Sequence, residues 1–417
     1  MEFTVKKDVM VRELNLVQGV VERRHTIPIL SNLLLDASED RLSITATDMD
    51  VSLCCKCVAS VRRPGALTVS AKKLFDAVRL LPDADIHMKM TDGESLSVTC
   101  QKAHFRMVGL PKDNFPSIPE LPWLNVSKPD QSSTATNVSG AESKKDSPSL
   151  KVDLPSGVLR QMISRTIFAI TQEESRYTLS GALLLLRPDS MTMVTTDGHR
   201  LAFVSKNANL AGATMEIRAL IPKKTLIELL KLTDFLTFKK ESSGESGEKK
   251  ENESEIAFGK DENHLYFAMK DHILVARVLA GQFPNYELVI PQGNPFHLIL
   301  RKEEMEHAIR RADVMADDIS HEILWRVDND RLEISASSSD LGEAHEIVTP
   351  ALPDDGSAYK GTPLAFGFNA QYLLEYLAAV GDEAVAFWFK DGEKQVLFEP
   401  QTKKDFLYKY VVMPRRM

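Results

Sequence analysis

The residues best suited to chemistry stand at positions 195–201, where the sequence reads TTDGHRL. Asp197 and His199, beside the hydroxyls of Thr195 and Thr196, are groups that a hydrolase could use as orienting acid, base and nucleophile. An Asp and a His two residues apart do not by themselves bring the imidazole against a nucleophile, and the sequence has no GxSxG elbow. A hydrolase built on Asp197 and His199 is therefore an alternative hypothesis.

Cysteine and histidine spacing gives little support for a metal site. Cys54, Cys55 and Cys57 crowd one predicted strand and Cys100 stands alone, with no second CxxC or HxxxH to complete a zinc site. Neighbouring residues of a strand also point to opposite faces. Nine further histidines are scattered without a carboxylate–histidine cluster: His25, His87, His104, His264, His272, His297, His307, His321 and His345. We expect reduced, packed thiols, no metal and no cofactor.

The TTDGHRL segment belongs to a predicted β-meander at residues 177–204, and this meander recurs. An apolar strand, a short turn, a second strand ending in Thr or Ser and then an Asp appear again at residues 30–53 and 321–348. Asp48, Asp197 and Asp340 are 149 and 143 residues apart in a chain of 417, so three copies fill the chain.

Each copy has the same further parts. Apolar residues at helical spacing predict a first helix at 7–22, 155–171 and 302–317, and a shorter one after the meander, starting at Ser70, Pro222 and Asn369. A second meander closes each copy, at residues 86–110, 255–278 and 384–413. The pattern predicts an α+β fold with two helices on antiparallel strands, used three times.

Composition and two polar segments divide the chain. The 43% apolar and 26% charged content is typical of a globular protein, and residues 126–149 and 239–255 are too polar to fold alone. We predict domains at 1–125, 150–290 and 291–417, a flexible linker at 126–149 and a disordered loop at 239–255. No run of eighteen apolar residues and no signal peptide is present at the start, so we expect a cytoplasmic protein without membrane contact.

Positive charge is gathered on the predicted helices although the formal net charge is −8. On a helical wheel Lys72, Lys73 and Arg79 point away from the apolar stripe of their helix, and Lys224 does so on the equivalent helix of the second copy. A solvated helix face would explain one such helix. Repetition of the pattern favours a basic surface for nucleic acid.

Seven segments, in this order, carry a resemblance to a known family: MEFTV at 1, TIPILSNLLL at 26, TATDMD at 45, RYTLSG at 176, TTDGHRLA at 195, GQFPNY at 281 and YVVMPRRM at 410. The chain resembles the bacterial DNA sliding clamps, the β subunits of DNA polymerase III. The resemblance implies three clamp domains per chain and a head-to-tail dimeric ring with helices inside and sheets outside. It implies a processivity factor that is not an enzyme.

By resemblance, duplex DNA would be contacted without sequence preference through Arg24, Arg176 and Tyr177, in addition to the helix cations. A groove for short apolar peptides of the replicative polymerase α subunit, the clamp loader, other polymerases and repair proteins would be lined by Leu179, Thr196, Gly198, His199, Arg200, Leu201, Pro284, Val289, Val411, Met413 and Pro414. Thr178 and Arg415 depart from the family pattern, which has a second aromatic and an apolar residue there.

The same resemblance places the dimer interface. Phe105 and Met107, on an edge strand of the first domain, would meet Val314 and Met315 of a second copy. Lys102 and Arg106 would then face acids such as Asp340, Glu343 and Glu346. A third hypothesis is a scaffold that binds peptides but never encircles DNA.

Overall fold

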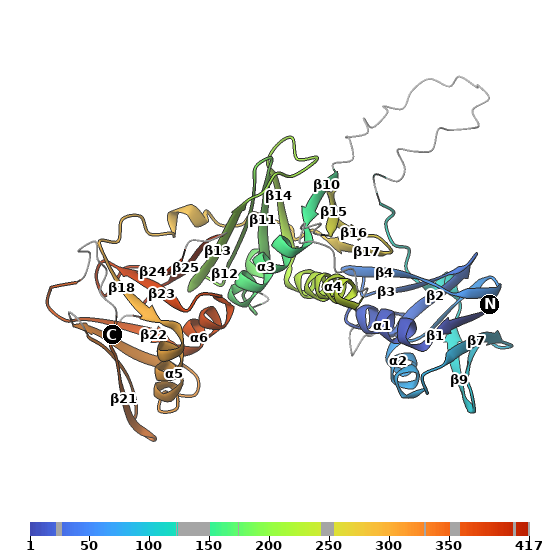
Figure 1. The fold of residues 1–417 in the computed structure, drawn as a ribbon, viewed down its shortest axis with the longest axis horizontal. Coiled ribbons are helices and arrows are strands. Elements are labelled where there is room, and N and C mark those ends of the chain that lie inside the picture. The colour runs from blue at the N-terminus through green and yellow to red at the C-terminus, as the bar shows by residue number, and fades with distance from the viewer. Residues whose placement is uncertain are drawn as a thin grey trace. The chain divides into compact units, whose positions relative to one another are not determined.

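The computed structural model describes residues 1–21, 27–121, 123, 151–173, 175–242, 254–328, 331–350, 359–402 and 406–415. These residues form two compact units (Figure 1). The first comprises Met1–Gly157, Ala211–Ala213 and Lys224–Val278, and the second Val158–Leu210, Thr214–Lys223 and Leu279–Met417. Each unit is described below by itself.

The first unit is built on one antiparallel sheet of thirteen strands. In spatial order the strands are β10 (Lys151–Pro155), β15 (Glu255–Lys260), β16 (His264–Met269), β17 (His272–Arg277), β4 (Val51–Val58), β3 (Arg41–Thr47), β2 (Asn32–Ser38), β6 (Gly65–Ser70), β9 (Ala103–Leu110), β8 (Ser95–Cys100), β7 (Asp85–Thr91), β1 (Glu2–Lys6) and β5 (Ser60–Arg63). The pair β17–β4 joins strands of the second and first sequence repeats, with His272 opposite Cys55.

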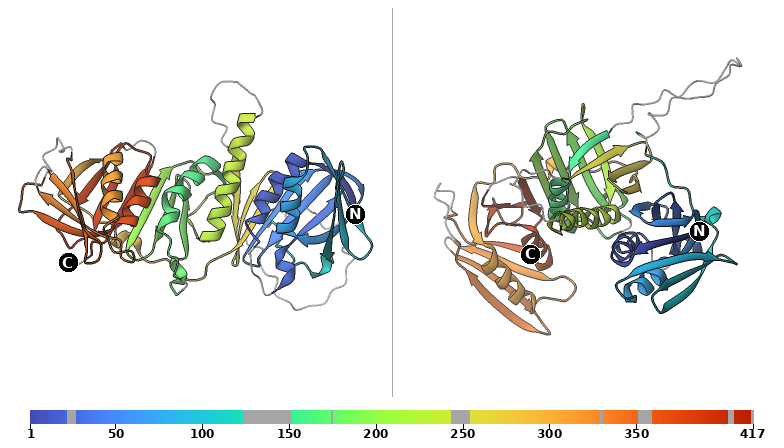
Figure 2. Two further views of the ribbon diagram at one scale, coloured as in Figure 1. Left: turned by 90° about the horizontal axis from the view of Figure 1, so that it is seen from below. Right: turned by 45° about the vertical axis from the view of Figure 1, so that its right-hand side comes forward.

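The first unit also contains three helices, α1 (Lys7–Gln18), α2 (Ala71–Leu80) and α4 (Lys223–Ser242). Helix α4 belongs to this unit from Lys224 onward. The first two pack side by side, as both views of Figure 2 show in blue. Met10, Leu14 and Val17 of α1 are fully buried because the 3.6-residue period keeps them on one face. On α2 the buried stripe is Leu74, Ala77 and Val78, as the periodicity predicts.

The second unit contains two antiparallel sheets. The larger has eight strands, in spatial order β14 (Ile217–Pro222), β11 (Gly181–Arg187), β12 (Ser190–Thr196), β13 (Arg200–Asn207), β25 (Leu407–Val412), β24 (Val396–Pro400), β23 (Ala384–Phe389) and β18 (Phe296–Arg301). The smaller has four, β21 (Gly342–Val348), β20 (Arg331–Ser338), β19 (Glu322–Asp328) and β22 (Leu364–Asn369). The pair β13–β25 joins the second repeat to the third.

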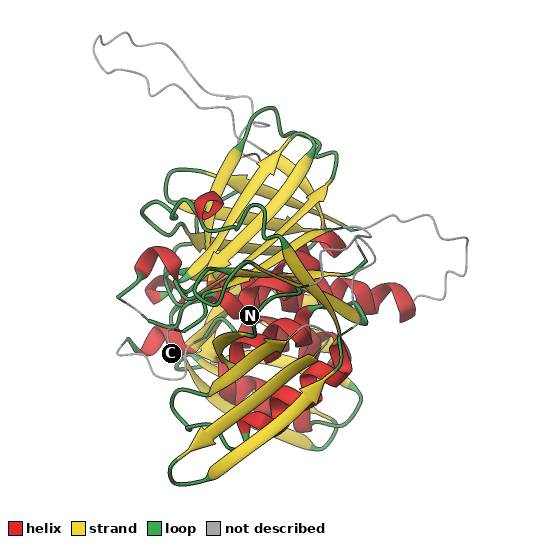
Figure 3. Ribbon diagram, turned by 90° about the vertical axis from the view of Figure 1, so that its left-hand side faces the viewer, coloured by secondary structure: helices red, strands yellow, loops and turns green. Residues whose placement is uncertain are grey.

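Helices α3 (Ser156–Thr166), α5 (Lys302–Asp313) and α6 (Ala370–Ala379) accompany these sheets, and Figure 3 separates them by colour from the strands. Helix α5 packs on α6 and on β20 and β21. Asn369 caps α6, because its side chain accepts a hydrogen bond from the backbone N–H of Tyr372. Buried rings of Trp325, Phe366 and Phe387 pack edge to face in the core of the third repeat.

The predicted order of helix, meander, helix and meander is confirmed in all three copies. Two details of the second copy differ from expectation. Helix α4 continues to Ser242 and β15 begins at Glu255, so the ends of the predicted loop 239–255 are regular structure. Residues 243–253 and the predicted linker 126–149 lie outside the described residues. The domain limits at 125, 150 and 291 stay predictions.

Candidate functional site

The turn between β12 and β13 is built by its own side chains. The Oδ1 atom of Asp197 accepts hydrogen bonds from the backbone N–H groups of His199, at 2.9 Å, and Arg200, at 3.0 Å. The Thr196 hydroxyl accepts from the N–H of Gly198 and donates to the carbonyl of Arg200. Gly198 has φ of +91°, which favours glycine. These bonds fix the shape of the TTDGHRL segment.

The first repeat contains an equivalent turn at Asp48. Its Oδ1 atom accepts from the N–H groups of Asp50, at 2.9 Å, and Val51, at 2.6 Å. The recurrent Asp of the sequence is therefore a turn-forming residue in the first two copies. In the third copy Asp340 is exposed and its own N–H approaches the Ser338 hydroxyl.

Arg200 occupies the base of the second-repeat turn and is almost fully buried. Its Nε donates to Asp197 Oδ2 at 2.9 Å, one terminal nitrogen donates to Glu375 of α6, and the other donates to the carbonyl of Phe168 at 2.7 Å. The guanidinium also lies 4.1 Å from the ring centre of Tyr372. Burial lowers the pKa of Arg200, but Tyr410, Glu375 and Asp197 together raise it above its usual range.

These contacts disfavour a hydrolase. Both carboxylate oxygens of Asp197 are engaged, Oδ1 by the backbone N–H groups of His199 and Arg200 and Oδ2 by the Arg200 side chain, so the carboxylate orients the turn and not the imidazole of His199. His199 itself is exposed at the tip of the turn. A base that is not oriented by the acid cannot take part in a triad.

A cleft of about 440 Å³ lies on the side of the turn where Arg200 is held. Its lining combines the turn with α6 and the segment after α3: Ile167, Phe168, Ile170, Thr171, Gln172, Glu173, Asp197, His199, Arg200, Lys223, Tyr372 and Glu375. Burial lowers the pKa of Lys223, Glu375 raises it, and Arg200 lowers it further. The cleft is lined by both apolar and charged side chains, and the Arg200 ion pairs form part of its wall.

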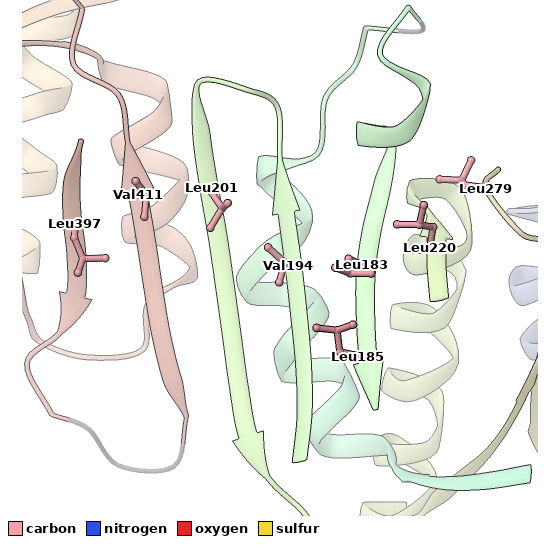
Figure 4. Close-up of a cluster of buried hydrophobic side chains, with 8 residues drawn as sticks. All are labelled: Leu183, Leu185, Val194, Leu201, Leu220, Leu279, Leu397 and Val411. Atoms are coloured by element: carbon pink, nitrogen blue, oxygen red, sulfur yellow. The ribbon is translucent and has the colours of Figure 1, made fainter. Parts of the chain in front are cut away.

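A cluster of buried apolar side chains lies on the opposite face of the eight-stranded sheet, as Figure 4 shows. Side chains alternate between faces along a strand, so Leu201 lies on this face while Arg200 lies on the other. The buried members are Leu183, Leu185, Val194, Leu201, Leu220, Leu279, Leu397 and Val411. Partly buried residues pack against them: Phe203, Phe283, Tyr286, Val289, Ile290 and Trp388. We call this set the apolar face.

The structure brings part of the predicted groove together. Leu201, Val289 and Val411 belong to the apolar face. The N–H of Met413 donates to the carbonyl of His199 at 3.0 Å, which ties the C-terminal segment to the turn. Met413 is 42% exposed, so its side chain is accessible beside the apolar face.

The remaining groove residues lie at the margins. Leu179 ends a short 3-10 turn, Tyr177–Leu179, and is half-buried, while Pro284 is exposed and Pro414 half-buried. Arg200 differs from the expectation. Its side chain supports the turn from the far side and does not belong to the apolar face.

The predicted DNA-contacting cations have unequal environments. Lys72, Lys73 and Arg79 are exposed on α2, as the helical wheel predicts. Lys224 differs, because its ammonium forms an ion pair with the buried carboxylate of Asp48 and the side chain is only 30% exposed. This pairing makes Lys224 a structural cation, less available to phosphate.

Two further predicted DNA residues lie beside the Asp197 turn. Arg176 donates to the carbonyl of Asp197 at 2.7 Å and pairs with Glu173 at 3.0 Å, and Tyr177 next to it is 53% exposed. Arg24 lies outside the described residues.

The strands predicted to form a dimer interface have accessible edges. Residues 103–108 of β9 pair with β8, and the pairing of β9 with β6 is confined to Gly109 and Leu110. Apolar side chains are exposed along β9, with Phe105 37% and Val108 80% exposed. Met107 is half-buried. Val108 was not predicted, and strand alternation places it on the face of β9 opposite to Phe105 and Met107.

The predicted counterpart in the third repeat is also accessible. Strand β21 pairs with β20 and carries Ile347, which is 55% exposed and was not predicted. Val314, after α5, is 68% exposed and Met315 is half-buried. Glu346 differs from expectation, since Arg311 of the same chain binds it through two hydrogen bonds of 2.7 and 2.8 Å.

Models of one protein family match the chain in three consecutive parts. They are described as the N-terminal, central and C-terminal domains of the DNA polymerase III beta subunit, and they match residues 1–119, 153–285 and 287–416. The chain belongs to the DNA polymerase III beta subunit family. The resemblance found in the sequence and the prediction of three clamp domains are thereby confirmed.

Relatives of this family match over their full length. The beta sliding clamp of Pseudomonas aeruginosa is 31% identical over 418 residues, and that of Escherichia coli K12 is 28% identical over 420, with 100% of each chain covered. A crystal structure of the DNA polymerase sliding clamp from Pseudomonas aeruginosa, 29% identical, has a TM-score of 0.82 with both chains covered completely. That from Caulobacter crescentus, also 29% identical, has a TM-score of 0.81.

Membership fixes the class of function. The beta subunit family consists of sliding clamps, which are processivity factors of DNA replication and not enzymes, and this chain is one of them. The hydrolase hypothesis is therefore wrong. Among the described residues no helix is long and apolar enough to cross a membrane.

Proposed function

We propose that two copies of this chain join head to tail in a ring around duplex DNA and that the ring tethers the replication machinery. The match of three clamp-domain models to residues 1–119, 153–285 and 287–416 carries this proposal. The accessible β9 and β21 edges support it, because exposed strand edges with apolar side chains are surfaces on which another strand pairs. The protein would act in the cytoplasm, where bacterial DNA is replicated.

Duplex DNA would be held without reading its sequence. Lys72, Lys73 and Arg79 are exposed on one helix, and such side chains attract phosphates whatever the bases. Arg176 and Tyr177 would add a contact from the second repeat. Because the ring would be linked to DNA topologically, these contacts can be weak enough for the protein to slide.

Partner proteins would bind at the apolar face beside the Asp197 turn. The exposed Met413 and the partly buried Val289 offer apolar contacts at the edge of the apolar face, and the turn offers polar edges, which suits a short peptide with hydrophobic anchors. We expect such peptides from the replicative polymerase α subunit, the clamp loader, other polymerases and repair proteins. A structure of the related clamp from Pseudomonas aeruginosa has been solved bound to griselimycin.

Retention on DNA tests the ring. A clamp loader should place the protein on nicked circular DNA, where it survives gel filtration in high salt, and linearising the circle should release it. Release from circular and linear DNA alike would overturn the proposal of a ring and would favour the hypothesis of a peptide-binding scaffold.

Removal of residues 413–417 tests the peptide site. This truncation should abolish binding of a fluorescent polymerase-derived peptide while leaving retention on circular DNA unchanged. Undiminished peptide affinity would show that the site lies elsewhere.

A further inference from the structure

Three buried side chains with metal-binding atoms meet inside the first unit, away from the surfaces described above. They are Glu13 on α1, Cys55 on β4 and His272 on β17, and they are 2%, 0% and 6% exposed. One carboxylate oxygen, the thiol sulfur and one imidazole nitrogen all lie within 4.8 Å of one another. Cys55 and His272 are directly opposite each other across the β4–β17 pair.

The neighbours orient this cluster. His272 Nε2 lies 2.8 Å from Glu13 Oε2, and the ring of Phe235 packs edge-on against the imidazole at 5.1 Å. Arg12 approaches the other carboxylate oxygen, Oε1, at 3.4 Å. The Oε2 atom therefore faces the imidazole while Oε1 is held by Arg12, and partners of this kind commonly orient metal ligands from outside.

The donor set has the right chemistry for zinc. Thiolate sulfur, imidazole nitrogen and carboxylate oxygen are its usual ligands, and three protein ligands leave one tetrahedral position for water. A Zn²⁺ ion with one thiolate, one carboxylate and one neutral imidazole has no net charge. A neutral group avoids most of the cost of burying charge in a sheet–helix interior. Magnesium and calcium, which prefer oxygen ligands, do not suit this set.

We propose that Glu13, Cys55 and His272 form a zinc site that fastens the first sequence repeat to the second. On binding, the Cys55 thiol releases its proton to solvent and the sulfur binds the metal. In the metal-free chain Nε2 of His272 carries the proton that is donated to Glu13 Oε2. On metal binding this proton leaves Nε2, the imidazole is protonated on Nδ1 instead and stays neutral, and the freed Nε2 lone pair binds the ion. Glu13 exchanges its hydrogen bond with His272 for a bond to the ion. Because α1 and β4 come from the first repeat and β17 from the second, the ion would link them.

Cobalt substitution tests the site directly. The reduced full-length chain, freed of metal by a chelator, should bind one equivalent of Co²⁺ and develop the near-ultraviolet charge-transfer band of a cobalt thiolate. It should also take one equivalent of Zn²⁺ from a chromophoric chelator. Absence of the band in the wild-type chain would overturn the proposal, and this measurement needs no variant.

Variants identify the ligands. Cys55→Ser should abolish the cobalt band, and His272→Gln should weaken Zn²⁺ binding at least tenfold. Cys54→Ser is the matched control, because Cys54 is the adjacent thiol on the opposite face of β4, within 3.2 Å of the Ser43 hydroxyl, and should bind like the wild type. An unchanged band in Cys55→Ser, or its loss in Cys54→Ser with the circular dichroism unchanged, would overturn the assignment.

Discussion

Replacing Arg200 by methionine tests whether the buried guanidinium holds the turn beside the apolar face. Methionine keeps much of the volume but removes the donors to Asp197, Glu375 and the carbonyl of Phe168. The Arg200 side chain is 7% exposed and that of Asp197 12%, so loss of the cation leaves a carboxylate poorly solvated and unpaired.

The expected loss of stability follows from these exposures. Breaking a buried ion pair by removing one partner costs about 3–5 kcal/mol. The Glu375 side chain is 45% exposed and can be rehydrated, so its share is at most about 1 kcal/mol. We therefore expect Arg200→Met to lower the free energy of unfolding by about 3 kcal/mol.

The assay follows urea unfolding by tryptophan fluorescence in a Trp123→Phe background. Trp325 and Trp388 then report the second unit, which contains Arg200. Arg218→Met is the matched control, because Arg218 pairs with Glu216 at 2.7 Å but is 67% exposed. Loss of such an exposed pair should cost under about 1 kcal/mol.

A second substitution separates the ion pair from simple packing. Asp197→Asn keeps the Oδ1 acceptor of the turn and removes the charge, so in the Arg200→Met background it should restore about 1–2 kcal/mol. Equal losses in Arg200→Met and Arg218→Met, or no restoration by Asp197→Asn, would refute the reasoning.

The remaining predictions concern the interface, the DNA-facing helix and a buried carboxylate. Phe105→Asp should yield monomers in size-exclusion chromatography with light scattering, because a charge would enter the apolar β9 edge, and a persistent dimer would contradict this assignment. Replacing Lys73 and Arg79 by alanine should reduce the slope of log affinity for linear duplex against log salt by about 0.9 per lost phosphate contact, while Lys56→Ala, on a strand, should leave it unchanged. Burial raises the pKa of Glu228, and Lys231 only partly offsets this. In the folded chain the Glu228 carboxyl stays protonated at pH values where the same carboxyl is already ionised in the unfolded chain. Its contribution to stability is therefore full below the usual carboxyl range and is lost as pH rises through the raised pKa. Glu228→Gln should therefore gain stability relative to the wild type as the pH rises above the usual carboxyl range; an unfolding difference independent of pH would be inconsistent with this.

The sequence was sufficient to predict the elements because each is a local pattern. Period-two alternation marks the strands of every meander, and the 3.6-residue stripe on α2 separates buried Leu74 from exposed Lys73. The pairs β4–β17 and β13–β25 were not predictable in this way. Their partners lie more than 200 residues apart, and nothing in one strand specifies which distant edge it will meet.

The candidate site shows the same division between local and distant information. The exposed cations of α2 and the apolar residues Leu201 and Val411 follow from local pattern and family resemblance. The ion pair between Lys224 and Asp48 does not follow from local pattern. A helical wheel places Lys224 on the solvent side of its helix, and Asp48 stands in a predicted turn, so the sequence indicates no contact between them. The Glu13, Cys55 and His272 cluster was missed because its members come from three elements and have no motif spacing.

Both joints between repeats within the chain combine a strand pair with a buried charge at the recurrent Asp turn. At the first joint, Asp48 forms an ion pair with Lys224 of α4, next to the β4–β17 pair. At the second, Asp197 is neutralised by Arg200 of its own turn, and the same guanidinium binds Glu375 of α6, next to β13–β25. The helix partner is thus a cation at one joint and an anion at the other. Because Asp48 is buried, a mismatch at the first joint would leave its charge uncompensated. Glu375 at the second joint is 45% exposed and can be rehydrated, so a mismatch there costs less. The two joints therefore depend on their helix partners to different degrees.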